Sequence, residues 1–251
     1  MNSACYVYAI LEHDVPLPLG LTGLQAAPLS LVRWGDLAAA VSPYAGMSVQ
    51  PTADALLGHE TVVEALCQAG PTLPCRFGTI LGGQEAVIQA LISRYDVLLA
   101  DLKRVGNKVE LGLTILFEEL QGQSEALNTA QPSPTLSTCN PGPGTRYLQS
   151  RALHYKHEAA QQHQAHLVIN ELQRILHPHT LEQRYRTLLE PRLAIRAVYL
   201  VHQGRVRELQ QAIGALRQTW PTLRWLISGP WPPYSFVSDA GMPFQQCGAR
   251  T

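Results

Sequence analysis

The sequence predicts an α+β protein with two domains, residues 1–106 and residues 107–251. Two features carry this prediction. Short apolar runs typical of strands are interspersed with longer stretches whose apolar residues recur at the helical period. In addition, a chain of 251 residues is long enough for two domains that each bury a core. Gly106-Asn107 is the expected boundary, because it separates a helical stretch from an apolar, strand-like run.

The first domain is predicted to open with a strand and a β-hairpin. Residues 6–11 are aromatic and aliphatic with little polar interruption, as buried strands are. Prolines and glycines between positions 16 and 23 mark a loop. Residues 29–33 and 37–42 then flank Trp34-Gly35-Asp36, which we interpret as the turn of a hairpin.

Two helices and a further strand complete the predicted first domain. Thr52 is a favoured N-cap for a helix that continues to Ala69, where Gly70-Pro71 ends it. Residues 72–81 are predicted to form one strand. Residues 84–104 keep the helical period throughout and are predicted to form one helix. The resulting order, βββαβα, is a less common mixed α+β arrangement.

The second domain is predicted to follow the order βαββαβ, a modified form of the ferredoxin-like arrangement. A polar loop at residues 121–144, rich in Pro, Ser, Thr, Gly and Asn, is longer than the loops that compact domains usually contain. The predicted strands cover residues 108–117, 181–189, 193–201 and 222–228, and the predicted helices cover residues 145–177 and 205–219.

The composition argues against several classes of partner. Charged residues make up 15% of the chain, against about 25% in a typical domain, and the formal net charge is zero. Nucleic acids and anionic lipid membranes are bound by concentrated positive charge, so neither is expected as a partner. No run approaches the roughly 18 consecutive apolar residues of a transmembrane helix, and no signal peptide opens the chain. We therefore expect a soluble, cytoplasmic protein.

The sequence predicts no metal, no cofactor and no catalytic site. Its five cysteines include no CxxC pair, which argues against a zinc site and a disulfide framework. The histidines of the predicted long helix form pairs on different sides of it, His154 with His157 and His163 with His166. His59-Glu60 begins like a zinc-protease helix, but the second histidine is absent. Neither a GxSxG nucleophile turn nor a glycine-rich phosphate loop occurs.

Arg76 is the most informative charged residue. It stands beside Phe77 in the predicted strand 72–81, where an unpaired charge would be costly to bury. One explanation is a structural ion pair with an acidic residue of the same chain. The other is that the guanidinium faces outward and binds carboxylate or carbonyl groups of a partner. The candidate acidic residues for the ion pair are Glu60, Glu64 and Glu110.

A segment rich in proline and aromatic residues lies near the C-terminal end, at residues 229–236. Its prolines restrict the backbone to an extended, non-helical path. Trp231, Tyr234 and Phe236 carry most of its apolar area. Two interpretations stay open: a rigid strap packed on its own domain, or a preformed docking edge for a partner.

Five short motifs follow one another along the chain. They are Gly35-Asp36-Leu37-Ala38-Ala39-Ala40-Val41-Ser42, Leu73-Pro74-Cys75-Arg76-Phe77-Gly78-Thr79, Val109-Glu110, Gly144-x-x-Tyr147-Leu148 and Gly229-Pro230-Trp231-Pro232-Pro233-Tyr234-Ser235-Phe236. In this order they resemble the gas vesicle GvpF/GvpL family, over nearly the whole chain. Cys75 departs from the family pattern, which has a branched aliphatic residue there, but it is small and apolar enough for a core position. The compact length favours the GvpF subgroup.

The resemblance implies a non-enzymatic accessory component of gas vesicles, the protein-walled buoyancy organelles of aquatic microbes. It implies a role in vesicle assembly or nucleation and a location at the gas vesicle in the cytoplasm. The expected partner is the hydrophobic shell protein (GvpA type), with other accessory proteins as further candidates. A small-molecule-sensing regulator that uses the ferredoxin-like domain is the alternative, by analogy of fold. The predicted partner-binding residues are Arg76, Phe77, Trp231, Tyr234 and Phe236.

Overall fold

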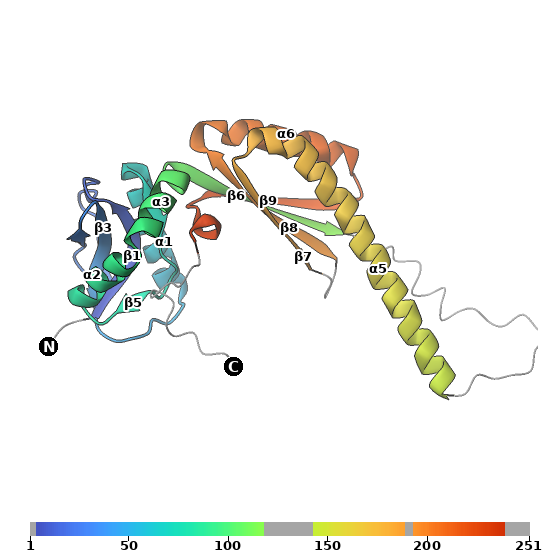
Figure 1. Ribbon diagram of the computed structural model, residues 1–251, viewed down its shortest axis with the longest axis horizontal. Coiled ribbons are helices and arrows are strands. Elements are labelled where there is room, and N and C mark those ends of the chain that lie inside the picture. The colour runs from blue at the N-terminus through green and yellow to red at the C-terminus, as the bar shows by residue number, and fades with distance from the viewer. Residues whose placement is uncertain (1–3, 118–142, 189–192, 239–251) are drawn as a thin grey trace, which may run out of the picture. The chain divides into compact units, whose positions relative to one another are not determined.

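The computed structural model describes residues 4–117, 143–188 and 193–238, and it has the predicted α+β class (Figure 1). The chain divides into two compact units. The first comprises the described residues of Met1–Leu111, Leu200–Val206 and Gly229–Thr251. The second comprises those of Gly112–Tyr199 and Arg207–Ser228. The domain division that the sequence suggested, 1–106 and 107–251, stays a prediction.

The first unit is built on a sheet whose central strand is β1 (Ala4–Glu12). Its path runs in the order β2-β3-β1-β4, and β5 also pairs with β1. β1 pairs antiparallel with β3, β4 and β5, and its position confirms the predicted strand 6–11. The other strands are β2 (Ser30–Trp34), β3 (Leu37–Tyr44), β4 (Thr72–Pro74) and β5 (Ile80–Leu81).

The predicted hairpin and the first predicted helix are confirmed. Trp34 pairs with Leu37 across a two-residue turn, in which Gly35 takes φ +55°, a left-handed value that favours glycine. Helix α1 covers Ala53–Ala69, and the Thr52 side chain accepts a hydrogen bond from the Ala55 N–H at 3.3 Å. Local sequence signals are therefore sufficient in this part of the chain.

The predicted strand 72–81 is wrong, because it is interrupted between β4 and β5. The Thr79 N–H and the Thr79 hydroxyl both donate to the Arg76 carbonyl, and these hydrogen bonds close a turn. Gly78 has φ +83° in this turn, which an apolar β pattern does not reveal. Arg76 and Phe77 therefore lie in a turn and not in a strand.

The predicted single helix 84–104 is also wrong, because it is two helices, α2 (Gln84–Ser93) and α3 (Tyr95–Val105). The break lies at Arg94, whose φ of −131° and ψ of 18° are not helical. The apolar period continues across Arg94, so the pattern alone could not detect the break.

The core of the first unit encloses β1 from both sides. Every residue from Cys5 to Leu11 is buried, and successive side chains of a strand point to opposite faces. Helix α1 contributes Val62, Val63 and Leu66 to the same cluster. A continuous apolar run is the sequence pattern that such a strand requires.

The second sheet has the strand order β7-β8-β6-β9. Its elements follow one another as βαββαβ, which confirms the predicted order of elements, while the ferredoxin-like assignment stays a prediction. The predicted polar loop 121–144 lies outside the described residues, except that α5 begins at Pro143. The elements are β6 (Lys108–Phe117), α5 (Pro143–Leu176), β7 (Glu182–Leu188), β8 (Ala194–His202), α6 (Val206–Thr219) and β9 (Leu223–Trp231).

Within the second unit, α5 and α6 cover one face of this sheet (Figure 1). The alternation along β6 agrees with that, because Leu113, Ile115 and Phe117 are buried while Thr114 and Leu116 are half-buried. None of the helices in the described ranges is long and apolar enough to cross a membrane.

The end of the described chain differs from the prediction in two ways. β9 continues past the predicted end, Ser228, as far as Trp231. The segment then leaves the extended path, because Tyr234–Phe236 form a 3-10 turn, η4, in which the Phe236 N–H donates to the Pro233 carbonyl at 3.1 Å. Proline lacks an N–H group, but its carbonyl can still accept such a hydrogen bond.

Candidate functional site

Residues 229–238, which we call the C-terminal strap, pack onto the first unit. Phe236 is fully buried, as are Pro232, Pro233 and Val237 to nearly the same degree. Trp231, by contrast, keeps 47% of its surface exposed. Of the two interpretations of this segment, the packed strap is the one that these contacts support, while Trp231 leaves one aromatic ring accessible.

Ser235 of the strap binds the carboxylate of Glu110. Its N–H donates to Glu110 Oε2 at 2.8 Å, and its hydroxyl donates to Glu110 Oε1 at 2.7 Å. Glu110 lies on β6 and is buried. A buried carboxylate needs such donors, because burying an unpaired charge is costly.

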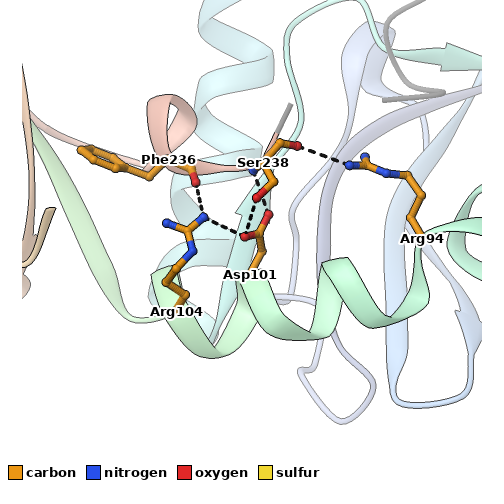
Figure 2. Close-up of polar contacts among 5 residues, drawn as sticks. All are labelled: Arg94, Asp101, Arg104, Phe236 and Ser238. Carbon is orange, nitrogen blue, oxygen red and sulfur yellow. Dashed lines mark hydrogen bonds and ion pairs between the residues drawn. The ribbon is translucent and has the colours of Figure 1, made fainter. Parts of the chain in front are cut away.

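Ser238 binds Asp101 of α3 in the same way (Figure 2). Its N–H and its hydroxyl donate to the two carboxylate oxygens at 2.8 and 2.9 Å. Arg104 forms an ion pair with Asp101 at 2.7 Å and also donates to the carbonyl of Phe236. Arg94, at the break between α2 and α3, donates to the Ser238 carbonyl at 3.3 Å.

The two serine–carboxylate contacts are chemically alike and three residues apart in the strap. In each, one serine satisfies both carboxylate oxygens with a backbone and a side-chain donor. Hydrogen bonds to a charged acceptor contribute about 1.5–3 kcal/mol each, more than neutral ones. The strap is therefore held by specific polar contacts as well as by the burial of Phe236.

Tyr234 connects the strap to helix α1. Its hydroxyl donates to Glu60 Oε2 at 3.1 Å and lies 3.3 Å from Nε2 of His59. Burial raises the pKa of the Glu60 carboxyl above its usual range, although the Tyr234 hydrogen bond acts in the opposite direction. Burial likewise raises the pKa of Tyr234 far above its usual value, so the phenol stays protonated and donates.

His59 is the centre of a buried aromatic cluster. Its ring stacks on Tyr8 and meets Tyr6 and Phe77 edge to face, with each pair of ring centroids 5.7 Å apart. Only 2% of His59 is exposed. Burial lowers the pKa of His59 to about 4, so the ring is neutral at pH 7.

The hydrogen bonds of His59 define one tautomer. Nε2 lies 3.2 Å from the Cys75 carbonyl, which can only accept, so Nε2 carries the proton. Nδ1 therefore accepts from the Tyr6 hydroxyl at 2.9 Å. The Tyr6 oxygen in turn accepts from the Gly78 N–H at 3.0 Å. This chain of hydrogen bonds ties the 75–79 turn to α1 and, through Tyr234, to the strap.

The thiols near this cluster are poor nucleophiles. Burial raises the pKa of Cys75 to about 12, and burial also raises the pKa of Cys67 to about 12. A thiol with such a pKa is protonated at neutral pH. Cys5, Cys67 and Cys75, which lie in the described ranges, are free and not in disulfides.

The predicted partner-binding residues lie in different environments. Arg76 is exposed in the turn, so the cost of burying its charge does not arise. Phe77 is half-buried and Tyr234 also contacts His59, so the fold brings these two residues to one cluster. Trp231 is exposed, whereas Phe236 is buried.

Two of the acidic residues that were candidate partners of Arg76 bind the strap. Glu60 accepts from Tyr234, and Glu110 accepts from Ser235. The sequence did not point to Asp101, Arg104 or Arg94, which complete the contacts with the strap. In the sequence, only the spacing of Ser235 and Ser238 hints at these contacts, and it does not indicate which carboxylates accept the hydrogen bonds.

A cavity of about 90 Å³ lies beside the exposed ring of Trp231. Its lining includes Glu64 and Cys67 from α1 and Lys108 from the start of β6. In the described part of the chain, no group of three or more His, Cys, Asp or Glu side chains is arranged to hold a metal ion.

Comparisons with known proteins agree with one another. The sequence matches the family "Gas vesicle synthesis protein GvpL/GvpF" over residues 4–238. It is 31% identical to gas vesicle protein F of a Streptomyces species over an alignment of 237 positions that covers 92% of this chain and 98% of that protein. It is 27% identical to gas vesicle protein L of the same species over an alignment of 256 positions that covers 94% of this chain and 93% of that protein.

The fold is similar to a solved structure as well. The crystal structure of the gas vesicle protein GvpF from Anabaena sp. PCC7120 superposes with a TM-score of 0.75 at 18% sequence identity. The match covers 94% of this chain and 97% of that one. At this identity the likeness shows that the two chains share a fold.

Proposed function

Because the chain belongs to the GvpL/GvpF family of gas vesicle proteins, we propose that it acts in gas vesicle formation by binding the hydrophobic shell protein and limiting its aggregation. The role is non-enzymatic, and the protein acts at the gas vesicle in the cytoplasm. Other accessory proteins of the vesicle are further candidate partners.

The observation that carries this proposal is the exposure of Trp231. Its ring is 47% exposed, although Pro232, Pro233 and Phe236 that follow it are buried. The backbone around Trp231 is therefore held in place before any partner arrives. Exposed tryptophans on a rigid backbone are frequent hot spots of protein interfaces, because little conformational entropy is lost on binding.

The position of Trp231 in the sheet suggests how a partner is held. Trp231 ends β9, which is an edge strand of the second sheet. Edge strands have unpaired backbone groups that can add a strand of a partner, and Pro230 limits such pairing next to Trp231. A hydrophobic shell subunit held in this way is kept from pairing with other subunits.

The proposal assigns different roles to the predicted partner-binding residues. Arg76, exposed in its turn, supplies a planar cation for carboxylate or carbonyl groups of the partner. Phe77, Tyr234 and Phe236 act indirectly, because their packing positions the turn and the strap.

An aggregation assay tests the proposal. Purified protein is mixed with the shell protein at equimolar ratio, and light scattering is followed over time. We expect the wild-type protein to suppress scattering and Trp231→Ala to lose most of that effect. Trp34→Ala is the matched control, because Trp34 is 46% exposed on another strand. Equal suppression by both variants, or no suppression by the wild-type protein, would contradict the proposal.

The alternative of a small-molecule sensor receives less support. The cavity beside Trp231 has about 90 Å³, whereas pockets for drug-sized ligands have roughly 300–1,000 Å³. A metabolite that co-purifies with the protein and is detected by native mass spectrometry would favour this alternative.

A further inference from the structure

The sheet of the second unit has one face that α5 and α6 leave uncovered (Figure 1). Successive side chains of a strand point to opposite faces of the sheet. The buried alternate residues of β6 and β8 therefore lie on the face that the helices cover, and the residues between them lie on the uncovered face. A Cβ on Gly112 would lie 2.5 Å from Ser228 Oγ, which places those two residues of β6 and β9 on the same face. We call this uncovered side the open face.

Arginines are concentrated on the open face. By alternation, it carries Arg184 and Arg186 of β7, Arg196 of β8 and Arg224 of β9, all exposed. The acidic residues at the described strand positions of this face are Glu182, which is half-buried, and Glu110, which is buried and accepts the Ser235 hydrogen bonds. Four cations in so small an area repel one another and attract negative charge.

Several of these arginines have their guanidinium groups available. In the described ranges, no hydrogen bond or ion pair is found for Arg186, Arg196 or Arg224. Each guanidinium can bind a carboxylate with two parallel hydrogen bonds.

From Gly112 onward, where β6 belongs to the second unit, the middle of the open face is uncharged and partly apolar. β6 lies between β8 and β9 in the sheet, and it contributes Thr114 and Leu116 here. Val198 of β8 is half-buried beside it, and Leu226 of β9 is 55% exposed. An apolar middle with cations on the strands to either side is a pattern that an amphipathic helix matches.

We propose that the open face is a docking surface for an amphipathic helix of a partner protein, with carboxylates along both borders of the apolar stripe of that helix. Neighbouring strands are about 4.8 Å apart and a helix is about 10 Å wide, so one helix spans the middle strands. Its apolar stripe covers Leu116, Val198 and Leu226, and its Asp or Glu side chains reach Arg186, Arg196 and Arg224. This inference is independent of the role proposed for Trp231.

Charge complementarity selects an acidic protein segment as the occupant. A single-stranded nucleic acid would also be attracted by the arginines, but its bases stack on aromatic rings. The described strand positions of the open face carry no Phe, Tyr or Trp side chain. Apolar side chains between the cations favour a partner that brings apolar groups of its own.

A peptide titration tests the inference on the full-length protein. The probe is a fluorescently labelled helical peptide of roughly 18 residues, about five turns, with a leucine stripe bordered by glutamates. A second peptide has lysine at every glutamate position. We expect the glutamate peptide to bind in a salt-dependent manner and the lysine peptide not to bind. Equal binding of both peptides, or binding of neither, overturns the proposal.

Charge reversal locates the binding surface. We expect Arg186→Glu/Arg196→Glu to raise the dissociation constant of the glutamate peptide by about tenfold or more. Arg217→Glu is the matched control, because Arg217 is exposed on α6 and not on the sheet, and we expect less than about a twofold change. Unchanged melting temperatures show that the variants are folded. Equal weakening of peptide binding by both changes overturns the proposal. It is also overturned if oligouridine binds the wild-type protein more tightly than the glutamate peptide does and the double variant abolishes oligouridine binding.

Discussion

The two sheets of this protein differ in how many of their faces are covered. In β1 every residue from Cys5 to Leu11 is buried, whereas β6 alternates between buried and half-buried positions beyond Leu111. The central strand of the first sheet is enclosed, and the strap is part of the same unit. The second keeps a face on which charged side chains are exposed. Residues of the first unit therefore act mainly through packing, whereas residues on the uncovered face of the second sheet can contact a partner.

Charge is distributed unequally along the chain as well. Residues 1–106 contain five Lys and Arg but nine Asp and Glu, so this part is acidic. The rest of the chain is basic to the same extent, because the total charge is zero. The composition argued only against nucleic acids and anionic membranes as partners, and a net charge of zero does not show that the two signs are separated along the chain.

Removal of the strap's anchor is the largest expected perturbation of the enclosed unit. Phe236 is fully buried, so Phe236→Ala should lower the free energy of unfolding by about 3–5 kcal/mol. Urea denaturation monitored by circular dichroism measures this loss. Trp231→Ala, which removes a half-exposed ring of the same strap, serves as the control and should cost clearly less. Similar losses for the two variants would show that the strap is not anchored by Phe236.

Acid should destabilise the enclosed unit through His59. The folded-state pKa of about 4 lies below the ordinary 6.5, so the unfolded chain binds the proton more readily between these values. The contribution of His59 to the free energy of unfolding is fully present above pH 6.5. It falls by about 3 kcal/mol as the pH drops to 4, because each unit of pKa difference corresponds to about 1.4 kcal/mol. Denaturation curves at several pH values measure this slope.

The other titratable groups facing His59 modify this slope. Glu60 has a raised pKa in the folded state, so its contribution has the opposite sign and decreases as pH rises through that pKa. Tyr6, Tyr8 and Tyr234 have raised pKa values and stay protonated in this window. His59→Gln should flatten the slope between pH 6.5 and 4. An unchanged slope in that variant would assign the acid sensitivity to other groups.

The serine–carboxylate contacts should contribute less than the anchor. Glu110→Gln replaces an acceptor oxygen by an NH₂ group that faces the donors of Ser235, so we expect a loss of about 1–3 kcal/mol. A double-mutant cycle with Ser235→Ala separates the direct contact from other effects of the substitution. A coupling free energy near zero would mean that Ser235 and Glu110 do not stabilise each other.

The smallest effect on stability is expected on the open face. Arg196 is exposed, and Arg196→Glu should change the free energy of unfolding by less than about 0.5 kcal/mol. Urea denaturation measures the change in the free energy of unfolding for Arg196→Glu and for Phe236→Ala in the same experiment. A loss comparable with that of the strap anchor would show that the open face is covered by another part of the protein and is not free for a partner.

Much of the fold follows from local sequence signals. The cap at Thr52, the turn at Gly35 and the apolar runs of β1 and β6 were sufficient to predict their elements. The failures lie where long-range contacts decide the backbone. Arg94 interrupts an apolar period that runs through α2 and α3, and its side chain binds Ser238, a residue distant in the sequence.

The candidate site was predictable only in part. The proline and aromatic residues identified the strap, and Trp231 is exposed as a docking residue requires. Whether Phe236 or Trp231 would be buried could not be predicted, because both are large and apolar and both lie in the same proline-rich segment. The role of His59 was missed as well, since a lone histidine in a helix gives no indication of the rings around it.

The sequence by itself determined the α+β class, most strand and helix positions and the family, because these depend on local periodicity, capping residues and short motifs. Only the tertiary structure decided which carboxylates hold the strap and which sheet face stays open. Ser235 and Glu110 are 125 positions apart, and Ser238 and Asp101 are 137 apart. A carboxylate binds whichever donors the fold brings within about 3 Å, and no local pattern of residues encodes that proximity.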